Sequence, residues 1–323
     1  WTKKKDGTTS AIMTLVADME GDGVVGDNRL KGHEEALKSY EQVIRFDQMR
    51  NANANEGRMA DQKTIVRFRE QSKDKLAYWL ADRMDQLGIL TLSGVPYTMR
   101  NNGAVRIGSK LPLLEFAADV KAPTNKRVAR WNGTTKGLEI GGGTGSVAAA
   151  DTPMWEMFVQ AKADLEEQYG RGVKGKGGGE TFHVFMTPTA MAKLKLDPTY
   201  MQNLRHAQTR DSSNPLFADG DVLVDGLHIH THRHIYNTSG AASASKWGAG
   251  GLVDGCQILF CGAQSMGMAD IGEAGWNEET DDYGNAMGLA IDKMLGFLKP
   301  QFYTQYAGGT VQDHGMMSIY VAQ

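Results

Sequence analysis

Four histidines alternate with other residues in the segment His228-Ile-His-Thr-His-Arg-His234. On a strand, the four imidazoles would point to one face, because successive side chains alternate between the two faces. Imidazoles spaced in this way can ligate zinc or another borderline metal. The alternative is a polar strand face that meets solvent, a partner or backbone carbonyls, and Asp225 is the closest preceding acid. We therefore predict that His228, His230, His232 and His234 are structural and that the chain needs no metal or other cofactor.

Three further motifs resemble binding loops, but each departs from its pattern. The segment Asp18-Met-Glu-Gly-Asp-Gly23 resembles the start of a calcium loop, but Arg29 stands at the twelfth position, where the loop needs a bidentate Glu. The glycine-rich segments 141–145 and 175–179 lack the Lys-Ser/Thr pair of a phosphate loop. The sequence therefore predicts no catalytic residues and favours a structural protein over an enzyme.

Composition fits a folded protein of two or three domains, since the chain has 323 residues, 41% hydrophobic and 23% charged. A net charge of −3 gives no global attraction to nucleic acid or anionic membrane. No apolar run is long enough to span a bilayer, so no membrane partner is expected. The two cysteines, Cys256 and Cys261, form no disulfide framework and fit a reducing compartment.

The first fifty residues predict a long two-stranded arm. Segments 11–19 and 40–49 resemble strands, and the acidic, glycine-rich tip lies between them. An isolated two-stranded ribbon is marginally stable in water, so the arm should be held by a neighbouring molecule. The asparagine-rich tract 51–55 predicts a turn after the arm. The candidate inter-subunit contacts are Met13, Leu15, Asp22, Asp27, Arg29, Glu34, Glu35, Tyr40, Arg45 and Phe46.

From Asp61 the apolar residues change to steps of three and four, which predicts one long helix ending at Gly88. Such a helix is a rod of roughly 40 Å. The residues expected on its core face are Ile65, Phe68, Ser72, Leu76, Leu80, Met84 and Leu87.

The rest of the chain mixes helices and strands, which predicts an α+β fold. Thr152 and Pro153 are typical of a helix start, and this helix should stop at Gly170. Its expected core residues are Met154, Phe158, Ala161, Leu165 and Tyr169. A second helix start at Thr187 and Pro188 should lead to a short helix through Leu194. The expected strands cover residues 181–186, 222–224, 227–235, 256–260 and 318–321.

Several segments resemble tailed-phage major capsid proteins, especially the capsid family typified by the podophage N4. The first hundred residues carry the most specific part of the likeness. The matching segments begin with Glu20-Gly-Asp-Gly-Val-Val-Gly-Asp, Leu30-Lys-Gly-His-Glu-Glu-Ala-Leu37 and Val43-Ile-Arg-Phe-Asp-Gln-Met-Arg50. They continue with Gly57-Arg-Met-Ala-Asp-Gln-Lys-Thr64, Leu76-Ala-Tyr-Trp-Leu-Ala-Asp-Arg83, Leu92-Ser-Gly94, Met186-Thr-Pro188, Ile258-Leu-Phe-Cys-Gly-Ala-Gln264 and Gly296-Phe-Leu-Lys-Pro-Gln-Phe302.

The resemblance implies the Hong Kong-97 capsid fold, with an extended loop, a long spine helix at 58–88, a peripheral domain and an axial domain. The implied parts are an N-terminal arm remnant at 1–7, an extended β-hairpin loop at 8–55, a peripheral domain at 56–180, an axial domain at 181–290 and a return to the peripheral domain at 291–323.

It further implies a major capsid protein that self-assembles into the icosahedral shell enclosing phage double-stranded DNA. The implied partners are other copies in hexamers and pentamers, neighbouring capsomers reached through the extended loop, cement or decoration proteins, a portal and non-specifically packaged DNA. The implied location is the virion capsid, after assembly in the host bacterial cytoplasm. Two rivals remain, namely the shell protein of a cellular nanocompartment and a metal-dependent enzyme that uses the strand from His228 to His234.

Overall fold

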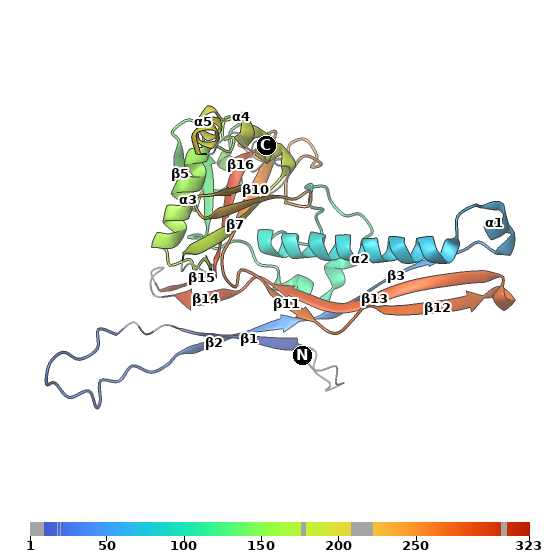
Figure 1. Cartoon of the computed structure of the whole chain (residues 1–323), viewed down its shortest axis with the longest axis horizontal. Helices are drawn as coiled ribbons and strands as arrows, with labels where there is room; N and C mark the ends of the chain where they lie inside the picture. Colours follow the sequence, from blue (N-terminus) through green and yellow to red (C-terminus); the bar gives the residue numbers. More distant parts are fainter. Residues whose placement is uncertain (1–9, 18, 20, 176–178, 208–221, 305–308) are drawn as a thin grey trace.

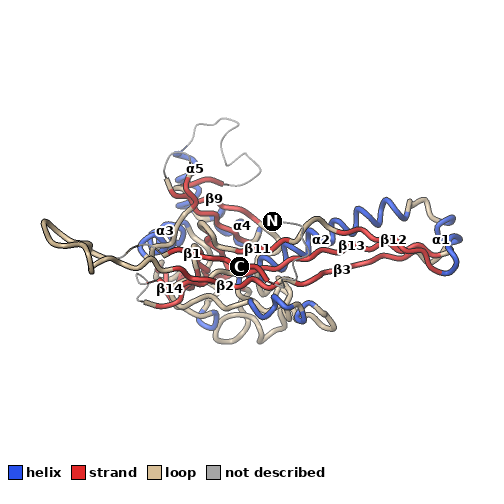
Figure 2. Tube along the Cα trace, turned by 90° about the horizontal axis from the view of Figure 1, so that it is seen from below, coloured by secondary structure: helices blue, strands red, loops and turns tan. Residues whose placement is uncertain are grey.

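The computed structural model describes residues 10–17, 19, 21–175, 179–207, 222–304 and 309–323, and the predicted segment 1–7 lies outside them. Its described part has an α+β architecture, as predicted. Figure 1 shows three regions: a body built on a large sheet, a long helix lying along an elongated sheet, and an arm. In Figures 1 and 2 the tip of the arm and the far end of the elongated sheet point in opposite directions, so the subunit is much longer than its body.

The body is built on an eight-stranded mixed sheet. In hydrogen-bonding order its strands are β5 (Gly137–Ile140), β4 (Val128–Asn132), β16 (Met316–Ala322), β10 (Gly255–Cys261), β7 (Glu180–Met186), β9 (Leu227–Thr231) and β8 (Val222–Val224), with β6 (Val173–Lys174) beside β7. β16 runs parallel to β4 and β7 parallel to β9. All seven residues of β10 are buried, which agrees with its apolar run Ile258-Leu-Phe-Cys261 at the centre of the sheet.

Helices cover both faces of this sheet. Alternate residues of β10 belong to different cores, because Ile258 and Phe260 pack with one cluster and Leu259 with another. The first cluster includes residues of α3 (Trp155–Glu167), α4 (Pro188–Leu196) and α5 (Pro198–Ala207). The second includes Leu92, near the end of the long helix. The large sheet is therefore sandwiched between α3–α5 and the end of α2.

The elongated sheet is centred on β13 (Ala286–Leu298). β11 (Gly267–Asp270) and β12 (Gly275–Asp281) pair with one of its edges, and β3 (Asp47–Ala54) pairs with the other. Helix α2 (Phe68–Ser93) lies along this sheet (Figure 1). The shared core contains Met49, Leu76, Leu80, Leu87, Leu90, Leu289, Ile291, Leu295 and Phe297.

The remaining elements are short. The arm is rooted in the hairpin of β1 (Ser10–Val16) and β2 (Ser39–Arg45), and a second hairpin pairs β14 (Gln301–Thr304) with β15 (Thr310–Asp313). Helix α1 (Arg58–Lys63) sits at the far end of the elongated sheet. The four 3-10 turns among the described residues are η1 (Leu111–Leu113), η2 (Glu115–Asp119), η3 (Thr144–Ser146) and η4 (Asp282–Gly284).

The long helix differs from the prediction at both ends. It begins at Phe68, because the chain is not helical between α1 and α2, where the β-branched run Thr64-Ile65-Val66 disfavours a helix. Ile65 is therefore fully exposed and not a core residue. Gly88 does not end the helix but lies buried within it, beside Phe297. The helix ends at Gly94, whose φ of 68° lies in the left-handed region that glycine adopts at helix ends.

The second strand of the arm is also two elements rather than one. The chain passes from β2 to β3 at Phe46, so that β2 pairs within the arm while β3 pairs with β13. The asparagine tract 51–55, predicted as a turn, lies mostly in β3. An edge strand tolerates these residues because their side chains find partners outside the sheet, as Asn53 does by donating to Ser72 Oγ at 2.9 Å.

The two later helices were predicted with different accuracy. Thr187 caps α4 as predicted, since its hydroxyl accepts a hydrogen bond from the Ala190 N–H at 3.2 Å. Helix α3 ends at Glu167 rather than at Gly170, so Tyr169 lies beyond the helix and is exposed, not a core residue. The helix starts at Trp155 rather than at Thr152, and the Asp197 carboxylate accepts the Trp155 N–H at 2.9 Å. A capping group from another part of the chain is invisible to a local pattern, which explains the shifted start.

Sheet membership does not follow the predicted division of the chain at residues 180 and 290. β4, β5 and β16 lie in the same sheet as β7, β9 and β10, although the prediction placed them in the other domain. Within the described residues, no helix is long and apolar enough to cross a membrane.

Candidate assembly surfaces and the histidine cluster

The root of the arm is packed against its own chain. Met13 and Phe46 lie partly buried beside Ile44, Ala269 and Leu298, which are fully or almost fully buried. These contacts join β1 and β2 to β11 and to the end of β13. The expectation that the whole arm lacks a partner in its own chain is therefore wrong for the root, and whether Met13 and Phe46 also contact a neighbour stays a prediction.

Polar and aromatic contacts hold the same root. The Arg45 guanidinium forms an ion pair of 2.8 Å with Asp119, which lies in η2. The rings of Tyr40 and Tyr303 lie 6.1 Å apart between centroids. Leu15 lines a cavity of about 270 Å³ that Tyr303 also lines. These interactions fix the orientation of the arm relative to the rest of the subunit, as a preformed docking element requires.

The outward face of the arm root is apolar and exposed. Ile12 and Val43 stand opposite each other in the β1–β2 pair, with exposed fractions of 65% and 50%. Val16 follows on the same face and is 55% exposed. A strip of exposed β-branched residues on a two-stranded ribbon is a typical protein-contact surface.

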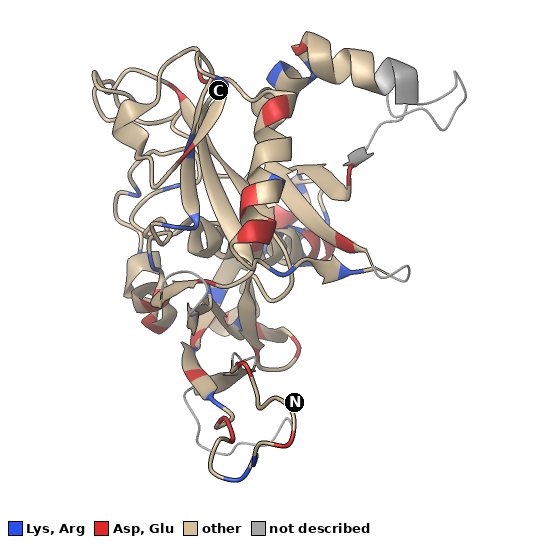
Figure 3. Cartoon of the chain, turned by 90° about the vertical axis from the view of Figure 1, so that its left-hand side faces the viewer, with Lys and Arg blue, Asp and Glu red and all other residues tan. Residues whose placement is uncertain are grey.

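The tip of the arm is mostly polar and exposed. The side chains of Asp22, Asp27 and Arg29 have no hydrogen bond or ion pair to the described residues, whereas two glutamates shape the loop. Glu34 accepts the Gly32 N–H at 2.6 Å and Glu35 accepts the Gly21 N–H at 2.8 Å. Backbone hydrogen bonds lower the pKa of Glu34. Figure 3 shows acidic and basic residues interspersed on this loop, at the bottom of the view. Asp18, the first residue of the motif that resembles a calcium loop, lies outside the described residues.

The four histidines do not share one strand face. β9 ends at Thr231, so only His228 and His230 alternate on it, while His232 and His234 lie in the turn that follows. The polar turn leaves the sheet and meets α2. The prediction of one four-imidazole face is therefore wrong.

His228 and His230 instead join His183 of the neighbouring strand. The parallel register places His183 opposite His228. Their ring centroids lie 5.0 Å apart, and His183 Nδ1 lies 2.9 Å from His230 Nε2 in a hydrogen bond. The ring planes of His183 and His230 differ by only 10°. Sequence reasoning missed His183 because it lies 45 residues before the motif.

The turn that carries His232 and His234 binds the exposed side of α2. His234 Nε2 lies 2.7 Å from Asp82 Oδ1, and the Arg233 guanidinium donates to the same oxygen at 2.6 Å. Burial acts to raise the pKa of Asp82, but hydrogen bonds and charge from His234 and Arg233 outweigh it, so this pKa is lowered overall. His232 Nε2 lies 3.9 Å from Asp85, and burial, aided by the charge of His234, lowers the pKa of His232.

None of these clusters has the geometry of a metal centre. Among the described residues, no three or more His, Cys, Asp or Glu side chains are arranged to hold a metal ion. The two cysteines lie inside the large sheet, and burial raises the pKa of each thiol to about 12, so neither is a ready nucleophile. The prominent features of the described residues are contact surfaces, which are typical of a structural subunit.

Comparison with known proteins gives this class its family. The chain belongs to the phage capsid protein family, whose model matches residues 2–323. The major capsid protein of Pseudomonas phage KPP25 is 56% identical over 312 residues, which cover 97% of this chain and 83% of that protein.

Solved structures agree on the fold. The capsid of Ralstonia phage GP4 has a TM-score of 0.78 at 22% identity, covering 98% of this chain and 84% of that one. The cyanophage Pam1 capsid has a TM-score of 0.74 at 20% identity, covering 99% of this chain and 86% of that one. The predicted Hong Kong-97-type fold and the resemblance to phage major capsid proteins are confirmed, and the narrower likeness to the N4 type stays a prediction. The chain is a virion protein of the capsid shell, not an enzyme, and neither rival function is favoured.

Proposed function

We propose that copies of this chain associate as hexamers and pentamers and close an icosahedral shell around packaged double-stranded DNA. The observation that carries the proposal is the arm, whose root is fixed on its own subunit while its outward strip and tip are exposed. A ribbon fixed in this way can add its exposed face to a second copy without reorganising, which reduces the ordering cost of association. Repeated weak contacts of this kind close a symmetric shell.

The domains of the proposed subunit follow the sheets. We assign the axial domain to the eight-stranded sheet with α3, α4 and α5, and the peripheral domain to α2 with the elongated sheet. The chain enters the axial part at β4 and returns to it with β16, which differs from the boundaries expected at 180 and 290. The extended loop comprises β1, the tip and β2.

The proposed contacts between capsomers use the exposed part of the arm. Asp22, Asp27, Arg29, Glu34 and Glu35 would contact a neighbour directly, together with the outward strip that begins at Ile12. Met13, Leu15, Tyr40, Arg45 and Phe46 would chiefly hold the arm at its angle, since each lies against its own chain.

Further partners follow from the family likeness. We propose a portal, cement or decoration proteins, and non-specific contact with packaged DNA, with assembly in the cytoplasm of the host bacterium. Two buried, unpaired cysteines agree with folding in a reducing compartment.

Deletion of residues 22–35 tests the role of the arm. We expect a soluble subunit with normal circular dichroism and thermal unfolding but no shells by electron microscopy, because the deleted residues lie outside every core cluster. A matched control replaces the same residues with a Gly/Ser segment of equal length, which separates the effect of length from that of the side chains. Shells of normal size from the deletion variant would contradict the proposal. Nuclease-protected DNA in particles purified from infected cells would distinguish a virion from a cargo-filled compartment.

A further inference from the structure

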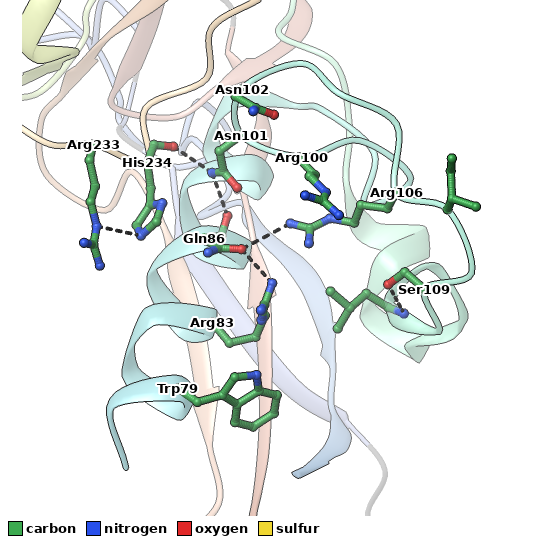
Figure 4. A pocket seen from close by; sticks show the side chains of 12 residues that line it. Trp79, Arg83, Gln86, Arg100, Asn101, Asn102, Arg106, Ser109, Arg233 and His234 are labelled. Carbon is green, nitrogen blue, oxygen red and sulfur yellow. Dashed lines mark hydrogen bonds between the residues drawn. The ribbon is translucent and has the colours of Figure 1, made fainter. Parts of the chain in front are cut away.

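A pocket of about 590 Å³ lies between the exposed side of α2 and the loop that follows it. Figure 4 shows Trp79, Arg83 and Gln86 of α2 on one side and Arg100 and Arg106 of the loop on the other. The loop residues Ile107 and Leu111 add apolar wall. The pocket therefore combines four guanidinium groups with aromatic and aliphatic surface. Arg233 is already paired with Asp82, which leaves the guanidinium groups of Arg83, Arg100 and Arg106.

The three arginines converge without a carboxylate between them. Arg83 donates to Gln86 Oε1 at 2.7 Å, and Arg106 donates to the same oxygen at 3.3 Å and to the Met99 carbonyl at 2.9 Å. Among the described residues, no Asp or Glu oxygen lies within 4.0 Å of the guanidinium of Arg83, Arg100 or Arg106. The nearby Asp82 is engaged by Arg233 and His234.

This arrangement places like charges in partly desolvated positions. Burial, together with the charges of Arg83 and Arg100, lowers the pKa of Arg106 to about 10. Burial likewise lowers the pKa of Arg83; the charge of Asp82 acts in the opposite direction, and the charge of Arg100 adds to the lowering. An anion in the pocket would relieve this repulsion and complete the hydrogen bonds of three planar donors.

The shape of the pocket favours a side-chain carboxylate over duplex DNA. A duplex carries its phosphates on a rod, and binding grows with the number of phosphates that a basic surface neutralises. Here the three arginines line one hollow rather than an extended surface that could follow a duplex. A short acidic segment with apolar neighbours matches both the charge and the apolar wall.

The chain itself carries such a segment. The arm tip holds the exposed carboxylates of Asp22 and Asp27, which have no hydrogen bond or ion pair to the described residues. Val25 and Leu30 beside them are 79% and 59% exposed. In Figure 1 the arm lies on the side of the elongated sheet opposite α2, so the tip does not reach the pocket of its own subunit. The complementary surfaces can meet only between copies.

We propose that the pocket formed by Arg83, Arg100 and Arg106 receives the acidic arm tip of a second copy of this chain, with Asp22 or Asp27 as the bound carboxylate. The inference rests on the proposed assembly through the arm and adds the receiving site to it. The pocket then acts as the socket that sets where the tip docks on its neighbour.

Charge reversal tests the pairing. Arg100→Glu changes an exposed side chain with no hydrogen bond or ion pair to the described residues, so the subunit should fold normally. Placing a carboxylate opposite the acidic tip should reduce the shell fraction about ten-fold or more, because juxtaposed like charges oppose association. Asp27→Lys or Asp22→Lys, combined with Arg100→Glu, should restore shells. Lys195→Glu, a reversal of an exposed residue on α4, serves as the matched control and should assemble normally.

A disulfide trap locates the tip directly. Ser109 lines the pocket, so Ser109→Cys combined with Asp27→Cys or Asp22→Cys should give a ladder of covalent oligomers from oxidised shells on a non-reducing gel. The native cysteines are buried and should not compete. Thr135→Cys, on an exposed turn of the body, replaces Ser109→Cys in the control and should give no ladder.

The outcomes separate this inference from the proposed function. If deletion of the tip abolishes shells but Arg100→Glu and Arg106→Glu both assemble normally and neither tip cysteine is trapped, the socket is wrong and the role of the arm stands. If the deletion variant forms normal shells, the proposed role of the arm in assembly is wrong, and the socket proposal that rests on it is wrong as well. Normal shells that lose only their DNA in the arginine variants would assign the pocket to phosphates and overturn the inference.

Discussion

The Lys299 ammonium lies 3.2 Å from Asp313 Oδ2, and neither side chain reaches solvent. The same carboxylate accepts the Thr124 N–H at 3.1 Å and the Gln301 side-chain amide at 2.7 Å. Lys299 directly follows β13, and Asp313 ends β15, shortly before the chain enters β16. The buried pair therefore lies where the chain passes from the elongated sheet to the large sheet.

Removal of one partner of this pair should be strongly destabilising. Asp313→Asn leaves the ammonium buried without a counter-charge, which typically costs about 3–5 kcal/mol. We expect a loss of this size in the free energy of unfolding of the unassembled subunit, measured by urea titration. Arg67→Ala is the control, because it breaks the exposed Arg67–Glu70 pair, whose contribution should be only about 0–1 kcal/mol. A loss near the control value for Asp313→Asn would mean that the pair is not buried.

The observed boundaries of the long helix predict that alanine substitutions along its predicted apolar face will lower the stability of the subunit by different amounts. Leu80 is buried against the elongated sheet, so Leu80→Ala should cost about 2–5 kcal/mol. Ile65 lies before the helix and is fully exposed, so Ile65→Ala should change stability by less than about 0.5 kcal/mol. Phe68, half-buried at the first turn, should fall between them. Equal losses at Leu80 and Ile65 would show instead that the helix begins earlier.

Local patterns predicted the parts of the fold that depend on neighbours in sequence. The buried run of β10, the cap at Thr187 and the α2 stripe at Leu76, Leu80 and Leu87 each follow from periodicity or from a capping residue. The helix end was wrongly predicted at Gly88 because a glycine in a helical pattern can either end the helix or allow close packing within it. Its missing side chain admits Phe297 beside the helix, whereas the left-handed turn that ends the helix lies at Gly94.

The sites depended on contacts that no local pattern reveals. The histidine motif was visible, but its partners His183 and Asp82 come from β7 and α2, and the parallel pairing of β7 with β9 sets the first contact. The arginine socket joins a helix to residues of an irregular loop, so Arg100 and Arg106 carried no periodic signal. The sequence shows their positive charge. Only the structure shows that no carboxylate among the described residues pairs with them.

Two histidines should make the subunit less stable as the pH falls below about 6.5. Burial lowers the pKa of His314, as do the charges of Arg171 and Arg127, and burial also lowers the pKa of His232. The unfolded chain therefore binds protons first, and stability falls from about pH 6.5 until the pH passes below the folded-state pKa values. Each histidine contributes a slope of at most about 1.4 kcal/mol per pH unit.

Urea titrations between pH 7.5 and 5 measure this effect. The variant His232→Asn/His314→Asn should show a flatter dependence than the parent, and His33→Asn, at the exposed arm tip, should not. Asp82 does not affect this measurement, because its pKa is lowered in the folded state. Its contribution to stability is fully present above the unfolded pKa near 3.9 and is lost only at lower pH. An unchanged slope in the double variant would contradict the assignment.

Chelation should leave assembled shells intact at neutral pH. His183 Nδ1 and His230 Nε2 lie 2.9 Å apart in a direct hydrogen bond. Each of these nitrogens therefore occupies the place beside the other where a metal ion would have to bind. A zinc ion would require at least three nitrogen or oxygen ligands converging at about 2.0–2.2 Å, and the described residues contain no such group. Purified particles treated with EDTA, with zinc-saturated EDTA as the control, should keep their sedimentation and their appearance by electron microscopy. Stoichiometric zinc by mass spectrometry, together with disassembly under EDTA alone, would replace the structural role of the histidines with a metal site.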